Sequence, residues 1–132
     1  MNLACCVGLS LLLWGPIALA DAAPRAGQKA VLVTGASTGI GRKITERLAA
    51  DGHFVYAGAR KEKDFAELNA IENVQAIRLD VTKPEEIAAA VATVTQAGRG
   101  LHGLVNNAGV AVAGSFVTTK DEDFDFVMDV NA

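Results

Sequence analysis

Short apolar runs alternate with longer segments of mixed polarity from residue 29 onward. The first run, 30–34, is a short β-branched stretch followed by glycine, which is typical of a buried strand. Three later runs have the same character and also predict strands. They cover residues 54–59, 75–79 and 101–106.

The segments between these runs carry apolar residues three or four positions apart, as helices that bury one face do. One helix is expected over 41–51 and a weaker one over 62–71. Two more are expected to begin at capping boxes, Thr-x-x-Glu sequences at 82–85 and 119–122, whose side chains can satisfy the first free amides. The first of these two continues until Gly98 and the second reaches the chain end. Their apolar residues are Ile87, Val91 and Val94 in the first, and Phe124, Val127 and Met128 in the second.

Strands and helices thus alternate along the chain. Such alternation requires parallel strands joined by right-handed crossovers. Because the strands are apolar almost throughout, rather than at every second position, we expect helices on both faces of the sheet. The sequence therefore predicts an α/β fold with a doubly wound parallel sheet.

A glycine-rich loop follows the first strand directly. It reads Thr-Gly-Ala-Ser-Thr-Gly-Ile-Gly over 34–41 and leads into a helix. Gly35 allows the sharp exit from the strand, Gly39 lets the backbone approach a pyrophosphate, and Gly41 lets helix and strand pack closely. An anion bound there would lie on the amides and the positive dipole of a helix N-terminus. The loop therefore predicts a nucleotide site.

The spacing G-x-x-x-G-x-G resembles the TGxxxGxG loop of the short-chain dehydrogenase/reductase family, and further markers of that family follow in order. Leu-Asp-Val at 79–81 resembles the end of the third strand, where the family's Asp hydrogen-bonds the adenine ring. Asn-Asn-Ala-Gly at 106–109 matches the NNAG motif, which steadies the sheet and lines the cofactor pocket. Asp-Val-Asn at 129–131 resembles the segment that carries the Asn of the catalytic tetrad.

The resemblance covers residues 29–132 and implies a Rossmann-like NAD(P)-binding domain that is incomplete at its C-terminus. It implies hydride transfer between a nicotinamide and a small alcohol or carbonyl substrate. Asn131 stands at the position of the family's catalytic Asn. The residues implied to bind the cofactor are Gly35, Ser37, Thr38, Gly39, Ile40, Gly41, Arg60, Asp80, Val81, Asn107, Ala108 and Gly109.

The end of the second strand bears on the choice of cofactor. NAD-specific domains usually place a carboxylate there to hold the ribose 2′-hydroxyl, but this chain has Ala59 followed by Arg60. A guanidinium can bind a 2′-phosphate through paired, charge-assisted hydrogen bonds. NADP is therefore favoured and NAD stays possible, since Thr38 occupies a loop position that is often basic in NADP-preferring relatives.

The general acid/base of the family is not found in this chain. In relatives, a Ser and a Tyr-x-x-x-Lys follow the Asn helix, and the Lys lowers the pKa of the Tyr. Tyr56 cannot replace that pair, because it and Arg60 lie in a strand, where four residues span about 13 Å. We therefore expect this chain to be the cofactor-binding part of a longer enzyme, inactive alone. A natural short product, and a non-catalytic dinucleotide-binding module or redox sensor, are the alternatives.

Composition argues against two classes of ligand, nucleic acids and metal ions. The 132 residues suffice for one domain, and a net charge of −3 without a basic cluster argues against nucleic acid. His53 and His102 have no neighbours at ligand spacing, and Cys5 and Cys6 lie together near the start, so no metal site is predicted.

The resemblance implies a homo-oligomer at full length. Without further strands, the fourth strand would expose an apolar edge that promotes self-association.

The first 20 residues differ from the rest of the chain. Residues 1–20 contain no charged side chain, centre on the apolar run 7–13 and end in Ala-Leu-Ala, a small-x-small pattern like a signal-peptidase site. Pro16 makes the stretch marginal as a membrane span, which needs about 20 apolar residues. We predict a signal-like segment followed by a linker over 21–28. The protein is exported or membrane-tethered if the segment is a true signal, and cytoplasmic otherwise.

Overall fold

The computed structural model describes residues 27–115 and 117–131. The signal-like segment 1–20 and most of the linker 21–28 lie outside the described residues, as do Phe116 and Ala132. Within the described part, no helix is both long enough and apolar enough to cross a bilayer.

A four-stranded parallel sheet forms the centre of the fold, with the strand order β3-β2-β1-β4. The strands are β1 (Ala30–Val33), β2 (Phe54–Ala59), β3 (Val74–Arg78) and β4 (Gly103–Val105). Ala30 of β1 lies opposite Phe54 of β2, and Val31 lies opposite Gly103 of β4. The chain crosses from one side of β1 to the other between β3 and β4. In such sheets, ligands bind at the carboxyl ends of the strands, where the order reverses.

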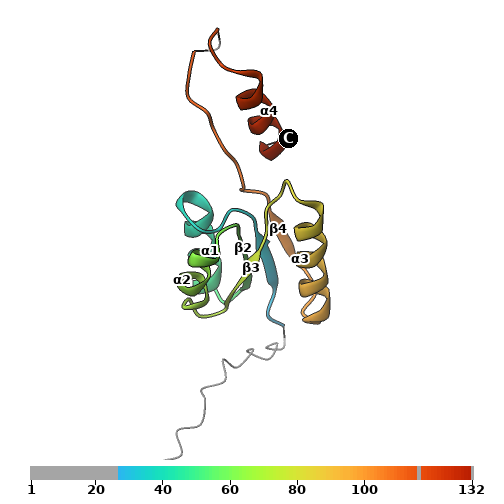
Figure 1. The fold of residues 1–132 in the computed structure, drawn as a ribbon. Coiled ribbons are helices and arrows are strands. Elements are labelled where there is room, and N and C mark those ends of the chain that lie inside the picture. Colours follow the sequence, from blue (N-terminus) through green and yellow to red (C-terminus); the bar gives the residue numbers. More distant parts are fainter. Residues whose placement is uncertain (1–26, 116, 132) are drawn as a thin grey trace, which may run out of the picture.

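Helices cover both faces of the sheet (Figure 1). The helices are α1 (Gly39–Ala50), α2 (Phe65–Asn69), α3 (Pro84–Gln96) and α4 (Asp121–Asn131), and the 3₁₀ turn η1 (Glu62–Asp64) precedes α2. Helices α1 and α2 lie on one face and α3 lies on the other. The doubly wound α/β fold is thereby confirmed, although the helix predicted over 62–71 is divided between η1 and α2.

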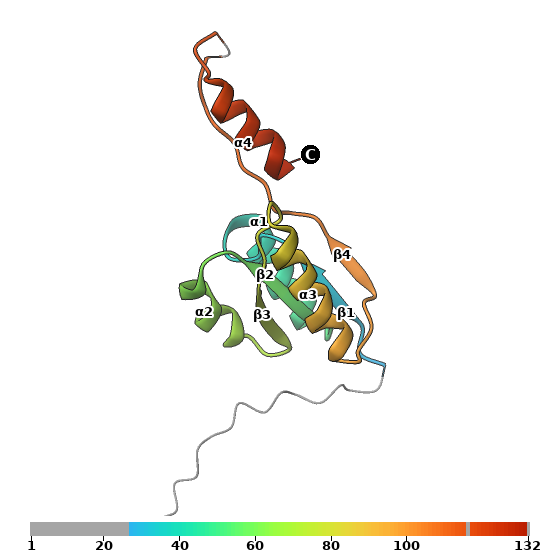
Figure 2. The ribbon, with the colours of Figure 1, turned by 45° about the vertical axis from the view of Figure 1, so that its right-hand side comes forward.

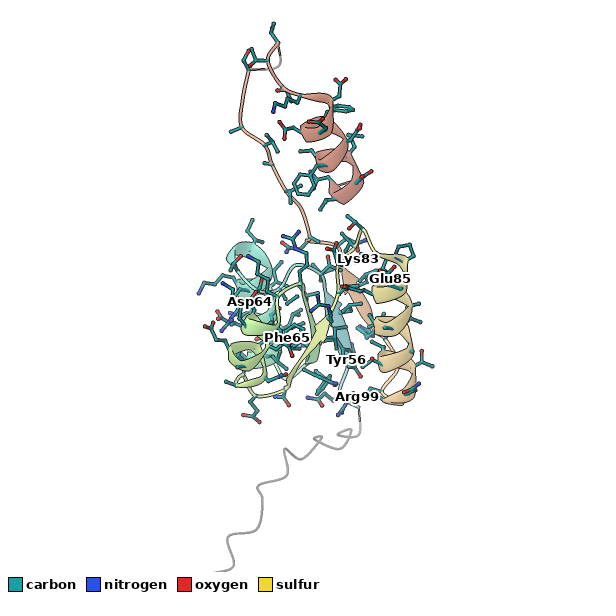
Figure 3. The ribbon with its side chains drawn as sticks, in the orientation of Figure 1. Tyr56, Asp64, Phe65, Lys83, Glu85 and Arg99 are labelled. Atoms are coloured by element: carbon teal, nitrogen blue, oxygen red, sulfur yellow. The ribbon has the colours of Figure 1, made fainter. Side chains whose placement is uncertain are left out.

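Strand β2 is buried along its whole length because both of its faces are covered. Successive side chains of a strand point to opposite faces. Val55 and Ala57 accordingly join the core under α1 and α2, whereas Phe54 and Tyr56 join the core under α3. Tyr56, which Figure 3 labels, has no exposed surface and packs edge-on against Phe54 with ring centroids 5.1 Å apart. Tyr56 is therefore a core strand residue, as the sequence predicts.

The two predicted capping boxes are wrong by one residue each. Helix α3 has Lys83 at its cap, and the Thr82 hydroxyl donates a 2.8 Å hydrogen bond to the Asp80 carboxylate. In α4, the carbonyl oxygen of Lys120, not of Thr119, accepts the first bond from the helical amides. Short hydroxyl side chains near a helix start bond to any nearby acceptor, so the Thr-x-x-Glu pattern does not by itself fix which residue is the cap.

The apolar residues of α3 are buried to different extents. Ala90 and Val94 face the sheet, whereas Ile87 is 41% exposed and Val91 is 59% exposed. In the described structure β4 is the edge strand of the sheet. Its Leu104 is also exposed, at 53%. Ile87 and Val91 thus lie in the predicted helix, but among the described residues neither is buried.

Helix α4 stands beyond the carboxyl ends of the strands (Figure 2). The segment 106–115 leads out from β4, and α4 then returns, so that its C-terminal end is the end nearer the sheet. This return brings the last residues of α4 back to the start of the segment that follows β4.

Candidate functional site

The glycine-rich loop between β1 and α1 has the backbone that its sequence predicts. Gly35 has a φ of 64° and Gly39 a φ of 58°, in the left-handed region where a side chain is disfavoured. Gly41 has no such constraint, but a Cβ there would overlap the carbonyl oxygen of Gly35 and Nδ2 of Asn107. Gly35 and Gly39 are thus required by conformation and Gly41 by packing.

The loop leads into the N-terminus of α1, which is not capped by a side chain. Thr38 holds the cap position of α1 in an extended conformation, but its side chain makes no capping hydrogen bond. The first turn of α1 contains no acidic residue. Since the first amides of a helix have no acceptor within the helix, this end of α1 can offer N–H donors and a positive dipole to an anion.

Asn107 joins the end of β4 to the glycine-rich loop. Its Nδ2 donates to the carbonyl oxygens of Thr34 (3.0 Å) and Gly35 (3.1 Å). The Cα of Ala108 lies 2.9 Å from where a Cβ on Gly35 would be, so the two segments are in close contact. The Asn107 side chain therefore holds the start of the loop against the end of β4.

Thr34 is a functional candidate that the sequence reasoning missed. It is 5% exposed, and its hydroxyl oxygen accepts hydrogen bonds from the backbone N–H groups of Asn107 and Ala108, each at 2.9 Å. The partners are more than 70 residues away in the sequence, so only the parallel pairing of β1 with β4 brings them together. One hydroxyl thus holds the start of the loop against the end of β4.

Replacing Thr34 with alanine is expected to lower the free energy of unfolding by about 2 kcal/mol, because two partly buried amides lose their acceptor. Thr34→Ser keeps the hydroxyl and is the matched control, with an expected loss below about 1 kcal/mol. Urea unfolding of the purified chain measures both values. Equal losses in the two variants would assign the effect to the Thr methyl group and contradict the role of the hydroxyl.

A cavity of about 270 Å³ opens at the carboxyl ends of the strands. It is bounded by the glycine-rich loop, the ends of β2, β3 and β4, and the last turn of α4. Of the predicted cofactor residues, those that line it are Gly35, Ser37, Thr38, Ile40, Gly41, Arg60, Asp80, Val81, Asn107, Ala108 and Gly109. The structure therefore brings together residues that the sequence places in separate motifs.

The predicted cofactor residues and the residues that line the cavity differ at five positions. Gly39 is not among the lining residues and has no heavy atom within 4 Å of where a Cβ would lie, so it faces open space. The remaining lining residues are not among the predicted cofactor-binding residues: Ala59, Leu79, Val110 and Val130. They are apolar neighbours of predicted residues, and their position immediately beside a motif is the only sequence signal that could have found them.

The two charged side chains of the cavity are Arg60 after β2 and Asp80 after β3. Burial opposes ionisation of Asp80, but the backbone and hydroxyl hydrogen bonds from Thr82, together with the positive charges of Arg60 and Lys83, hold the pKa of Asp80 below its ordinary value. Asp80 is therefore an acceptor-only carboxylate at neutral pH.

Asn131 lies at the end of α4 and bonds to the loop after β4 through both ends of its side-chain amide. Its Oδ1 accepts from the Val110 N–H at 2.9 Å, and its Nδ2 donates to the Val110 carbonyl oxygen at 2.8 Å. Asn131 is not one of the lining residues, whereas its neighbour Val130 is. Its side chain thus holds the wall of the cavity in place.

Among the described residues, no group of three or more His, Cys, Asp or Glu side chains is arranged to hold a metal ion. His53 and His102 lie near the amino ends of β2 and β4, at the opposite end of the strands from the cavity. Cys5 and Cys6 lie outside the described residues.

Several known proteins are similar to this chain in sequence. A family model described as short chain dehydrogenase matches residues 29–132. Retinol dehydrogenase 7 of Mus musculus is 38% identical over 107 residues, covering 78% of this chain and 34% of that protein. The mitochondrial D-beta-hydroxybutyrate dehydrogenase of Rattus norvegicus is 35% identical over 119 residues, covering 83% of this chain and 35% of that protein.

A solved structure is similar over the same region. The crystal structure of a short-chain dehydrogenase from Streptomyces avermitilis superposes with a TM-score of 0.73 and 36% sequence identity, covering 80% of this chain and 39% of that chain. The chain spans about a third of the length of the curated relatives it matches.

Proposed function

This chain belongs to the short-chain dehydrogenase family, and we propose that it forms the NADP(H)-binding part of an oxidoreductase. The reaction we propose is hydride transfer between the nicotinamide ring and a small alcohol or carbonyl compound. The enzyme class is that of its relatives, which are dehydrogenases. The choice of NADP, the substrate class and the residue roles below are parts of the proposal.

The observation that carries the proposal is the convergence on one cavity of the glycine-rich loop and the residues after β2, β3 and β4. The end of α1 beside it has no side-chain cap and no acidic residue in its first turn. Such an end favours a pyrophosphate, because unpaired N–H groups and a positive dipole face the negative charge. These features fit a dinucleotide.

Within this proposal, the charged side chains act on the adenosine half of the cofactor. The Asp80 carboxylate accepts a hydrogen bond from the adenine amino group, and the Arg60 guanidinium pairs with the ribose 2′-phosphate. When bound, the cofactor supplies the hydride acceptor or donor, and the protein supplies binding and orientation. Asn131 acts through Val110, because its side-chain amide is engaged by that backbone.

Titration of the purified chain with NADPH and NADH, followed by coenzyme fluorescence, tests the proposal. We expect saturable binding of both, with NADPH the tighter. No binding of either coenzyme would contradict the proposed function. Tight binding by a longer protein that turns over no alcohol or carbonyl compound would instead favour a dinucleotide-binding module or redox sensor.

Replacing Arg60 with glutamate is expected to weaken NADPH binding at least about 10-fold, since a carboxylate would face the 2′-phosphate in place of a guanidinium. NADH binding should change less than about twofold, because NADH has no 2′-phosphate. Lys61→Glu is the matched control: it makes the same change of charge at the next, exposed position, which does not line the cavity. Equal losses of NADPH affinity in both variants would indicate a general electrostatic effect.

A further inference from the structure

The turn after β3 is held in place by several hydrogen bonds. It carries Asp80 and Val81, both of which line the cavity. The backbone N–H and the hydroxyl of Thr82 donate to Oδ1 of Asp80 at 3.1 and 2.8 Å. The Lys83 N–H donates to the Asp80 carbonyl oxygen at 3.0 Å and closes the turn. These bonds fix the side chain and the carbonyl group of Asp80.

The N–H of Asp80 is held by a residue outside the cavity, Glu86. Its Oε2 accepts from the Asp80 N–H at 2.8 Å, while its Oε1 accepts from Nε of Arg78 at 3.2 Å and lies 3.5 Å from Nζ of Lys83. The Glu86 side chain is 14% exposed. Figure 3 labels Lys83 and Glu85, which mark the end of α3 where Glu86 lies, next to the carboxyl ends of the strands. Glu86 thus joins β3, the turn and α3.

An ionised carboxylate is suited to this place in a way that an amide is not. Both of its oxygens are acceptors. Burial opposes ionisation of Glu86, but the hydrogen bonds from the Asp80 backbone and Arg78, with the charges of Lys83 and Arg78, hold its pKa below the ordinary value. A glutamine of the same size has one acceptor and one donor, so either the Asp80 N–H or the Arg78 guanidinium would face a donor.

We propose that Glu86 is a positioning residue for adenine selectivity, because its carboxylate holds the Asp80 N–H and thereby orients the Asp80 carboxylate and the Val81 backbone toward the purine edge. The inference rests on the proposed function, since it requires a bound adenine coenzyme. It extends that function to a side chain that does not itself line the cavity.

The test compares the Kd of NADPH with that of reduced nicotinamide hypoxanthine dinucleotide phosphate, in which a carbonyl oxygen replaces the adenine amino group. Wild-type chain is expected to prefer NADPH about 10-fold, because the Asp80 carboxylate accepts from the amino group and repels the carbonyl. In Glu86→Gln, NADPH affinity should fall about 5- to 10-fold and affinity for the analogue less than about twofold, so the preference is nearly lost. The control Glu85→Gln removes the same charge from the neighbouring exposed position and should keep the preference.

The ratio of the two affinities separates positioning from general destabilisation, which would weaken both ligands alike. Glu86→Asp, which keeps two acceptors on a shorter side chain, should give an intermediate ratio and serves in place of Glu86→Gln if that variant does not fold. A wild-type ratio retained in the Glu86 variants would overturn the inference, and so would a wild-type chain without preference for adenine. A wild-type chain that binds neither coenzyme contradicts the proposed function itself.

Discussion

Replacing Gly41 with alanine is expected to weaken NADPH binding by the purified chain at least about 100-fold, equivalent to about 2.8 kcal/mol. A Cβ at this position overlaps the Gly35 carbonyl oxygen and Nδ2 of Asn107. The first is backbone, and the second is held by two hydrogen bonds to the loop, so neither can move without reshaping the proposed pyrophosphate site. Fluorescence titration measures the loss of affinity, and urea unfolding should show a destabilisation of about 1–3 kcal/mol.

The matched control is Gly103→Ala. Gly103 lies in β4, and an added Cβ would lie 3.7 Å from the nearest atom, a methyl carbon of Val31, which is ordinary contact. This variant should bind NADPH within about twofold of wild type, because it leaves the loop unchanged. Wild-type affinity in Gly41→Ala would show that the loop tolerates the displacement, and the assignment of the anion site to this loop would fail.

Replacing Asn107 with aspartate is expected to destabilise the chain by about 3 kcal/mol and to abolish the ordered loop. The substitution keeps the shape of the side chain, but it turns an N–H donor that bonds to two carbonyl oxygens into a carboxylate oxygen that faces them. Facing acceptors leave a partly buried charge without a partner, which costs more than the loss of a neutral hydrogen bond. Of a total stability of about 5–15 kcal/mol for a typical domain, this is a large fraction.

Asn106→Asp is the control, since Asn106 is exposed and immediately precedes Asn107. It introduces the same charge one residue away and should change the free energy of unfolding by less than about 0.5 kcal/mol. Urea unfolding of both variants gives the comparison. If the two were equally stable, the Nδ2 bonds of Asn107 would not contribute to holding the loop.

The features that follow from local sequence were predicted well. The bounds of β2 match the apolar run 54–59, because a strand buried on both faces must be apolar at every position. The glycine-rich loop was predicted at the positions where the structure has positive φ or close packing. The family resemblance is confirmed over 29–132. Helix caps were predicted less well, because a Thr side chain near a helix start can form hydrogen bonds with several different groups. Thr82 and Thr119 illustrate this, since each lies one residue before the observed cap.

The sequence alone predicted the parallel sheet and the glycine-rich loop after β1. Both follow from local patterns, the spacing of apolar residues and the spacing of glycines, which depend only on residues close together in the chain. Only the tertiary structure decided that the Thr34 hydroxyl and the Glu86 carboxylate hold the segments around the cavity. The Thr34 hydroxyl meets the amides after β4 because β1 and β4 pair in parallel, and Glu86 meets the Asp80 N–H because α3 folds back on β3. Both hydrogen bonds depend on distances of about 3 Å between atoms of different elements, and residue order alone does not set such distances.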